Sequence, residues 1–273
     1  MSGRWLWAWL LPGYVFLYLP IALMAVFSFN DARLLTAWGG FSFRWYVALW
    51  QDQVLIDAGL LSLRIAAISA SVATILGTAA GYALARFGRF RGRAGFAALL
   101  NVPLVLPDVI AGIALLLLFV ALQRLIGMPA QRNAGTIAIA HATLALAYVA
   151  VVVRARLADA GTELEEAAAD LGAPPWVVFA RITLPLMRPA VVSGWLLAFT
   201  LSLDDLVVAS FVSGPGATTL PMVLFSAAKR GVGPEFYALA TIVMAIVLLA
   251  LAGAWLARRI GAQHPVAPRP PVG

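Results

Sequence analysis

The sequence predicts an all-α polytopic membrane protein with six transmembrane helices. Of its 273 residues, 63% are hydrophobic and 11% are charged, whereas ordinary soluble domains contain about 25% charged residues. Six apolar stretches are close to or above the roughly 20 residues that cross a bilayer as a helix. They cover residues 5–29, 60–85, 95–122, 135–153, 189–212 and 236–257. The chain has no cysteine, which excludes disulfide scaffolds and thiolate metal sites. No cofactor and no metal site is expected.

The positions of the basic residues predict the orientation of the chain. If the amino terminus is inside, the cytoplasmic segments hold Arg4, Arg86, Arg89, Arg91, Arg93, Arg154, Arg156, Arg181, Arg188, Arg258, Arg259 and Arg269. The outer segments then hold only Arg33, Arg44, Arg124, Arg132, Lys229 and Arg230. The positive-inside rule therefore favours both termini in the cytoplasm. We interpret the cluster 86–93 as a purely topological signal. Because the basic residues are dispersed, the net charge of +7 does not indicate nucleic-acid binding.

Glycines and prolines modify the second and third spans. Gly77 and Gly81 form a G-x-x-x-G pattern, which permits close approach of helices and is interpreted as ordinary packing. Pro103 and Pro107 interrupt the third span, so we expect that helix to be kinked or broken. Broken helices are tolerated in a membrane only where the backbone is buried in protein or lines a cavity. We expect residues 1–260 to form one transmembrane domain, followed by a disordered cytoplasmic tail at 261–273.

The segment 154–188, between the fourth and fifth spans, is too long and too patterned for a simple connection. Thr162 and Glu165 have the spacing of a capping box that begins a helix, and Gly172 is placed to end that helix in a left-handed conformation. A following proline can begin a second short helix, which Pro185 is expected to end. One interpretation is an amphipathic hairpin on the membrane surface. The other is a projection that fits a groove on a soluble partner.

This segment resembles the EAA loop of ABC importer permeases. The residues that match the pattern E-A-A-x3-G-x9-I-x-L-P are Glu166, Ala167, Ala168, Gly172, Ile182, Leu184 and Pro185. The resemblance implies the type I importer permease architecture. It also implies that the loop forms coupling helices that dock into a cytoplasmic ABC ATPase dimer.

Three further stretches resemble the permeases of polyamine importers, and those of putrescine systems in particular. They are 201–206, 213–222 and 103–109. The resemblance implies a multi-pass permease subunit in a bacterial inner membrane that imports a polyamine, with putrescine favoured and spermidine or another cationic solute left open. It further implies a homologous second permease and a periplasmic polyamine-binding protein as partners.

Acidic residues inside the spans are candidates for the solute path or its gate. Charges within a membrane are costly unless paired or hydrated, and they are functional by default. Asp204, Asp205 and Asp108 are expected in the middle and outer part of the bilayer, where a cation would enter. Adjacent helical residues point about 100° apart, so one aspartate of the pair is expected to face the path. The other would then pair with Arg64 or a neighbouring helix.

Each of these candidates has a structural alternative. Asp108 could instead N-cap the half-helix after the break. His141 is interpreted as a hydrogen-bonded residue between helices. Tyr148 and Trp195 could contact an ammonium group through their rings, although aromatic residues in spans usually only pack.

Two other classes of protein compete with the importer interpretation. An intramembrane aspartyl protease needs two aspartates that converge on one water, which the adjacent pair 204–205 does not offer. A passive cation channel would use acidic rings but has no use for an ATPase-docking loop. The chain also lacks a nucleotide-binding G-x-x-x-x-G-K-[ST] loop. We therefore expect a non-enzymatic subunit whose partner hydrolyses ATP.

Overall fold

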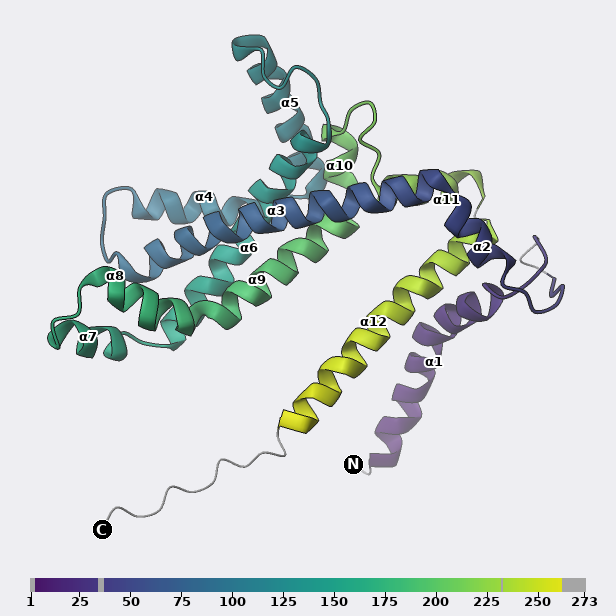
Figure 1. Cartoon of the computed structure of the whole chain (residues 1–273), viewed down its shortest axis with the longest axis horizontal. Helices are drawn as coiled ribbons and strands as arrows, with labels where there is room; N and C mark the ends of the chain where they lie inside the picture. Colours follow the sequence, from purple (N-terminus) through teal and green to yellow (C-terminus); the bar gives the residue numbers. More distant parts are fainter. Residues whose placement is uncertain (1–2, 34–36, 232, 262–273) are drawn as a thin grey trace. The chain divides into compact units, whose positions relative to one another are not determined.

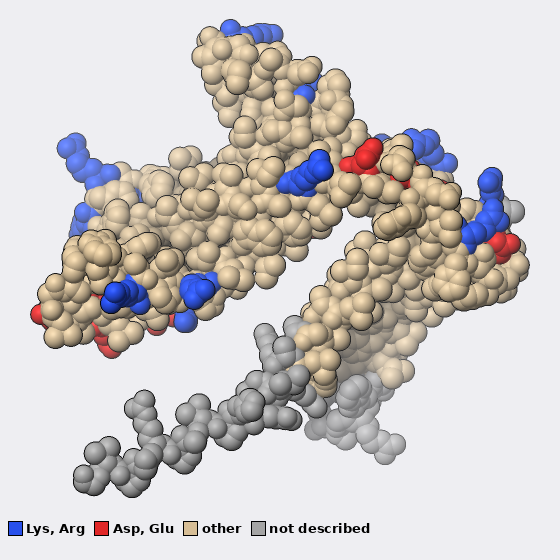
Figure 2. Space-filling view, in the orientation of Figure 1, with Lys and Arg blue, Asp and Glu red and all other residues tan. Residues whose placement is uncertain are grey.

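The computed structural model describes residues 3–33, 37–231 and 233–261, and the predicted tail lies mostly outside this range. The chain divides into two compact units, Met1–Gln53 with Ala227–Gly273 and Val54–Ser226. Among the described residues, six helices are long and apolar enough to cross a membrane, as predicted (Figure 1). They are Trp9–Phe27, Gln53–Arg86, Asp108–Ile126, Ala134–Asp159, Pro175–Asp204 and Pro234–Gly253. Charged side chains are sparse on the visible surface (Figure 2).

The first unit contains α1 (Gly3–Phe27), α2 (Arg44–Gln51) and α12 (Pro234–Gly261). Helix α12 packs against both α1 and α2. The short helix α2 is amphipathic and buries Trp45 and Leu49. The indole Nε1 of Trp45 donates to the backbone carbonyl of Asn30 at 2.7 Å. The side-chain Nδ2 of Asn30 donates to the backbone carbonyl of Ala37 at 2.7 Å. These bonds anchor the loop between α1 and α2.

The second unit is built around α6 (Ala134–Asp159), the most buried of the candidate spans. Helices α3 (Gln53–Arg86) and α9 (Leu184–Asp204) pack against it through small residues. A Cβ atom on Gly77 would lie 2.6 Å from the Leu146 carbonyl oxygen, and one on Gly81 would lie 2.6 Å from that of Ala150. The G-x-x-x-G pattern therefore brings the backbones of α3 and α6 together, as expected from helix packing in membranes.

The predicted third span is two helices, α4 (Arg93–Val105) and α5 (Asp108–Ile126). The expected boundaries of 95–122 were wrong, because only α5 is long enough to be a candidate span. Leu106 is extended, with φ −70° and ψ 130°, as the residue before a proline prefers. The chain turns between α4 and α5 (Figure 1), so the break predicted from the prolines is confirmed.

The predicted fifth span, 189–212, is also interrupted. Helix α9 ends at Asp204, and a separate short helix, α10, covers Val207–Val212. Helix α11 (Leu220–Arg230) follows. The fourth span is longer than expected from 135–153, because α6 continues to Asp159.

The segment 154–188 contains the two predicted short helices, α7 (Glu163–Asp170) and α8 (Pro175–Val178). Gly172 has φ +82° and is left-handed, as predicted. The predicted capping box was wrong: the Thr162 side chain makes no capping hydrogen bond. The Glu165 carboxylate instead forms an ion pair with Arg86 and accepts a hydrogen bond from Thr183.

The expectation that Pro185 ends the second short helix was also wrong. A π-helical turn, Phe179–Thr183, connects α8 directly to α9, and Pro185 lies in the first turn of α9. The backbone N–H of Leu184 donates to the carbonyl of Phe179, the wider bond of a π turn. Proline is tolerated in a first turn, where its missing N–H is not needed, so the helix continues into the membrane-spanning segment.

Candidate functional site

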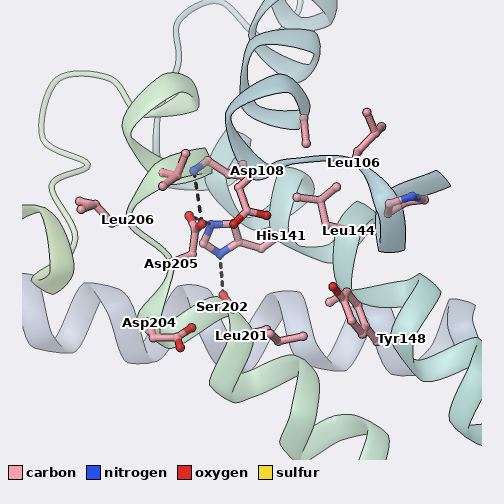
Figure 3. A pocket seen from close by; sticks show the side chains of 15 residues that line it. Leu106, Asp108, His141, Leu144, Tyr148, Leu201, Ser202, Asp204, Asp205 and Leu206 are labelled. Carbon is pink, nitrogen blue, oxygen red and sulfur yellow. Dashed lines mark hydrogen bonds and ion pairs between the residues drawn. The ribbon is translucent and has the colours of Figure 1, made fainter. Parts of the chain in front are cut away.

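A cavity of ≈ 330 Å³ lies where α5 begins, beside α6 and the break between α9 and α10. The break and the start of α5 bring three aspartates to its wall. The lining residues that carry the argument are Asp108, His141, Tyr148, Ser202, Asp204 and Asp205 (Figure 3). The acidic groups that lie in two separate stretches of the sequence therefore meet in one cavity.

Asp205 forms the break between α9 and α10. Its backbone is extended, with φ −68° and ψ 124°, so the chain leaves the helix immediately after Asp204. The Asp205 carboxylate accepts hydrogen bonds from the backbone N–H groups of Ala209 at 2.7 Å and Val208 at 3.3 Å. These are N–H groups that a helix start leaves without a partner inside the helix. Asp205 therefore caps α10.

The same carboxylate is bound to α6 through His141. Asp205 Oδ2 lies 3.0 Å from His141 Nε2, and His141 Nδ1 lies 2.6 Å from Ser202 Oγ. The His141 side chain is only 4% exposed and that of Asp205 only 16%. An ionised carboxylate can only accept, so an ionised Asp205 takes this hydrogen bond from the protonated Nε2 of His141. Ser202 Oγ lies 2.9 Å from Ser69 Oγ on α3, so the network joins three helices. The expectation that His141 is a hydrogen-bonded residue between helices is confirmed.

Asp204 and Asp108 have different surroundings from Asp205. Both are exposed at the cavity. Within the described part of the chain, neither carboxylate pairs with the side chain of another residue. Asp108 is the first residue of α5, and the N-cap is Pro107 without a side-chain capping bond. The alternative that Asp108 is an N-cap was therefore wrong. Its negative charge faces the positive end of the α5 dipole, which stabilises it.

The two aromatic candidates separate in the structure. Tyr148 lines the cavity. Trp195 does not belong to its lining: its ring stacks on Phe199 with centroids 5.2 Å apart, and its indole Nε1 donates to Ser71 Oγ at 3.2 Å. Trp195 is therefore a packing residue between α9 and α3, rather than part of the acidic cavity.

Arg64 is also separate from the aspartate pair. It lines a second, open cavity of ≈ 520 Å³ together with Asp57 on α3 and Thr218 in the loop before α11. Asp205 pairs with His141 instead of Arg64. The sequence did not reveal this choice, because the partner lies on another helix.

The segment 154–188 forms the second candidate surface. Two of its large apolar side chains have no cover among the described residues: Leu171 is 89% exposed and Trp176 73%. Glu166 and Ala167 are exposed on α7, whereas Ala168 and Ile182 are half-buried. Leu184 and Pro185, at the start of α9, are exposed. Exposed apolar patches of this kind mark interaction sites.

Sequence reasoning missed two groups of residues near these surfaces. Ser69 and Ser202 complete the His141 network, and Arg86 and Thr183 hold Glu165. Serine and threonine in Ala-rich spans carry no local signal that separates them from packing residues. The one available hint was the position of Ser202, two residues before Asp204.

Comparison with known proteins agrees with this architecture. Residues 73–262 match the family model of the binding-protein-dependent transport system inner membrane component. The chain is 57% identical to the putrescine transport system permease protein PotI of Escherichia coli K12 over 238 residues, 87% of this chain and 85% of that protein. It is 42% identical to the spermidine/putrescine transport system permease protein PotC of Haemophilus influenzae, over 86% of this chain and 89% of that one.

The solved structures that resemble the chain are transporters as well. A bacterial ABC transporter for import of the acidic polysaccharide alginate matches with a TM-score of 0.70 and 19% identity, over 94% of this chain and 96% of that one. The MetNI methionine ABC transporter matches with a TM-score of 0.61 and 18% identity, over 78% and 98%. These two likenesses concern the fold. Taken with the family match, they make the chain a multi-pass membrane component of a transport system rather than an enzyme, and it belongs to the family of binding-protein-dependent transport system inner membrane components.

Proposed function

We propose that the chain is the permease subunit of an ATP-driven importer that moves a polyamine, putrescine, into the cytoplasm by alternating access. The observation that carries this proposal is the acidic cavity. It presents the carboxylates of Asp108 and Asp204, which have no competing side-chain partners among the described residues, beside the ring of Tyr148. Two carboxylates and an aromatic ring suit a short alkyl chain with an ammonium group at each end, through charge-assisted hydrogen bonds and cation–π contact.

The relatives support the same solute. The E. coli protein at 57% identity is named for putrescine, and the H. influenzae protein at 42% is named for spermidine and putrescine. Spermidine, a longer polyamine, has the same ammonium chemistry. We favour putrescine because the relative named for it alone has the higher identity.

The coupling segment 154–188 supports an ATPase partner. Its exposed apolar residues need a cover, and Leu171 and Trp176 lie on the two sides of the left-handed turn at Gly172. We propose that a cytoplasmic ABC ATPase dimer supplies that cover. A homologous second permease and a periplasmic polyamine-binding protein complete the complex in the bacterial inner membrane. Closure of the ATPase would rock the helices between outward- and inward-facing states, a rigid-body change known in transporters.

The test is uptake by the purified complex in liposomes. The chain, its ATPase, the second permease and the binding protein are reconstituted with ATP inside, and labelled putrescine and spermidine are added outside. We expect ATP-dependent accumulation of putrescine that unlabelled putrescine competes away. Accumulation of spermidine alone would change the solute, and ATP-independent equilibration of either cation would favour a channel. ATP hydrolysis without uptake of either cation would contradict the proposed solute class.

A further inference from the structure

Arg86 occupies a different environment from the other basic residues of its cluster. Its Nη1 donates to the carbonyl of Leu157 at 3.1 Å, and its Nη2 donates to that of Gly161 at 2.6 Å. These carbonyls belong to the end of α6 and the turn that follows it. The interpretation of the cluster as only a topological signal therefore does not describe Arg86.

The third group on the Arg86 side chain reaches the coupling segment. Arg86 Nε forms an ion pair with Glu165 Oε2 on α7 at 2.7 Å. The other carboxylate oxygen, Oε1, accepts a hydrogen bond from the hydroxyl of Thr183 at 2.7 Å. Thr183 is buried and ends the π turn that leads into α9. We call Arg86, Glu165 and Thr183 the clamp. It holds together the end of α3, the end of α6, helix α7 and the start of α9.

The clamp is nearly closed to solvent. The Arg86 side chain is 10% exposed and that of Glu165 is 14% exposed. Separating a buried ion pair is costly, because each charge loses its partner without regaining water. A movement of α7 is therefore expected to carry α3, α6 and α9 with it. Each of these three helices bears a residue of the cavity network away from the clamp: Ser69 in the middle of α3, and His141 and Ser202 near the far ends of α6 and α9.

We infer that the clamp is the device that transmits movement of the coupling helices to the helices that line the acidic cavity. Arg86 and Glu165 are positioning residues, since they act through the helices that they join and touch no solute. The inference rests on the proposed function. It assigns the transmission step to a residue of α3 that lies outside the EAA pattern, and to the glutamate that precedes that pattern.

Arg93 offers a matched control. It belongs to the same basic cluster on the same side of the membrane. In the described part of the chain, its guanidinium donates only to the carbonyls of Leu84 and Gly88, at the end of α3 and in the loop that follows it. Arg93→Gln therefore removes the same charge and the same number of carbonyl bonds without touching the clamp.

The experiment measures ATP hydrolysed per molecule of putrescine imported, in the complete complex in liposomes and per assembled complex. Coupling between sites in proteins is typically 5–150-fold. We expect the ratio to rise about tenfold in Glu165→Gln and Arg86→Gln, because hydrolysis continues while the cavity helices no longer follow. Arg93→Gln should keep the wild-type ratio.

A merely structural clamp would give a different result. Hydrolysis and uptake would then fall together in assembled complexes, and an unchanged ratio would overturn the inference. If the glutamine variants do not assemble, the variant Thr183→Val tests the inference instead. Valine has nearly the shape of threonine but lacks its hydroxyl, so this variant removes one hydrogen bond. We expect it to raise the ratio of ATP hydrolysed to putrescine imported about threefold, as the loss of one hydrogen bond predicts. An unchanged ratio in Thr183→Val would count against the clamp in the same way.

A second readout does not depend on the solute. The chain has no cysteine, so spin labels can be placed at Leu164 on α7 and at Phe87 after α3, both exposed. In the wild-type complex we expect the label distance to be the same without nucleotide and with ATP bound, because the clamp moves as one body. In Glu165→Gln the distance should change with ATP. A wild-type distance that changes as much as the variant's would overturn the inference, even if putrescine proves not to be the solute.

Discussion

At the scale of single residues, Asp204 and Asp205 are neighbours in the sequence, but their carboxylates have different surroundings in the structure. The Asp205 carboxylate is engaged by His141 and by two backbone N–H groups of α10. Asp204 faces the cavity without a side-chain partner among the described residues. The sequence predicted that the two would differ but not which one was engaged, because the decisive partner is 64 residues away. In the proposed function, the carboxylates that remain for a cation are therefore those of Asp204 and Asp108.

The first prediction concerns these two carboxylates. Asp204→Asn and Asp108→Asn each remove a negative charge from the cavity wall and nearly preserve the shape. We expect each to raise the KM for putrescine uptake about tenfold, since hydrogen bonds to charged groups contribute roughly 1.5–3 kcal/mol. The concentration dependence of labelled uptake in the reconstituted complex measures it. Asp57→Asn, in the second cavity, should leave the KM unchanged. An unchanged KM in both cavity variants would show that these two carboxylates have a structural role and do not bind the solute.

The second prediction concerns the His141 network. His141→Ala leaves Asp205 and Ser202 without their shared partner in a buried place. We expect a loss of about 2–4 kcal/mol in the free energy of unfolding, from the unsatisfied polar groups and the space left behind. The melting temperature of the purified complex should fall accordingly. Thr143→Ala is the control two residues away, because its exposed hydroxyl bonds only its own helix at Ile139. Equal melting temperatures for both variants would contradict the network.

At the scale of helices, two breaks bring the carboxylates to the cavity, and only one of them was predictable. The break before α5 follows from Pro107, because proline restricts the residue before it. The break after Asp204 has no proline or glycine at 204–207. It is stabilised instead by the Asp205 cap on α10 and by His141, contacts that depend on the folded arrangement. The predicted capping box failed for the same reason: Glu165 has a stronger partner in Arg86, 79 residues away in the sequence.

The third prediction concerns the packing of α3 on α6. Gly77→Ala and Gly81→Ala place a methyl group 2.6 Å from a carbonyl oxygen of α6, at Leu146 and Ala150. The helices must separate, and overpacking of this kind costs about 1–3 kcal/mol. Thermal unfolding of the purified protein measures the loss. Gly95→Ala on α4 meets open space and should be neutral or slightly stabilising, because alanine favours a helix more than glycine does. A stable Gly81→Ala would mean that the two helices are not in close contact.

The fourth prediction concerns the turn between the coupling helices. Gly172 has φ +82° and its N–H donates to the carbonyl of Ala169 at 2.9 Å. Proline fixes φ near −65° and has no N–H, so Gly172→Pro destroys the turn. We expect the protein to insert into the membrane but to lose ATP-coupled uptake. Glu166→Lys, which reverses an exposed charge on α7, should have the same effect.

The control for that turn is Gly172→Asn, because asparagine tolerates the left-handed conformation better than other residues with a side chain. It should keep most of the uptake. Full uptake with normal ATP hydrolysis in both Gly172→Pro and Glu166→Lys would show that the segment 154–188 is not the coupling element.

At the scale of the whole molecule, the scarce charges were more informative than the abundant apolar residues. Composition predicted a membrane protein, the six apolar stretches predicted its six membrane-spanning helices, and a short pattern around Glu166 predicted the family. None of these could predict the clamp or the His141 network, because both join helices that are distant in the sequence. Local patterns also could not decide between cation contact and packing for Trp195, whose ring packs on Phe199.

The last prediction is the sidedness that the basic residues imply. Because the chain has no cysteine, single cysteines report exposure to a thiol reagent that does not cross membranes. Leu171→Cys lies in the coupling segment, and Gln131→Cys lies in the loop between α5 and α6; both positions are exposed. The excess of basic residues in the segments on the Leu171 side places those segments in the cytoplasm. In cells whose outer membrane has been made permeable while the inner membrane stays intact, the reagent should therefore label Gln131→Cys and leave Leu171→Cys unlabelled. Inverted inner-membrane vesicles that have been stripped of the ATPase should give the reverse pattern. Labelling of Leu171→Cys from outside would place the coupling segment on the side that has no ATP, and the importer mechanism would fail with it.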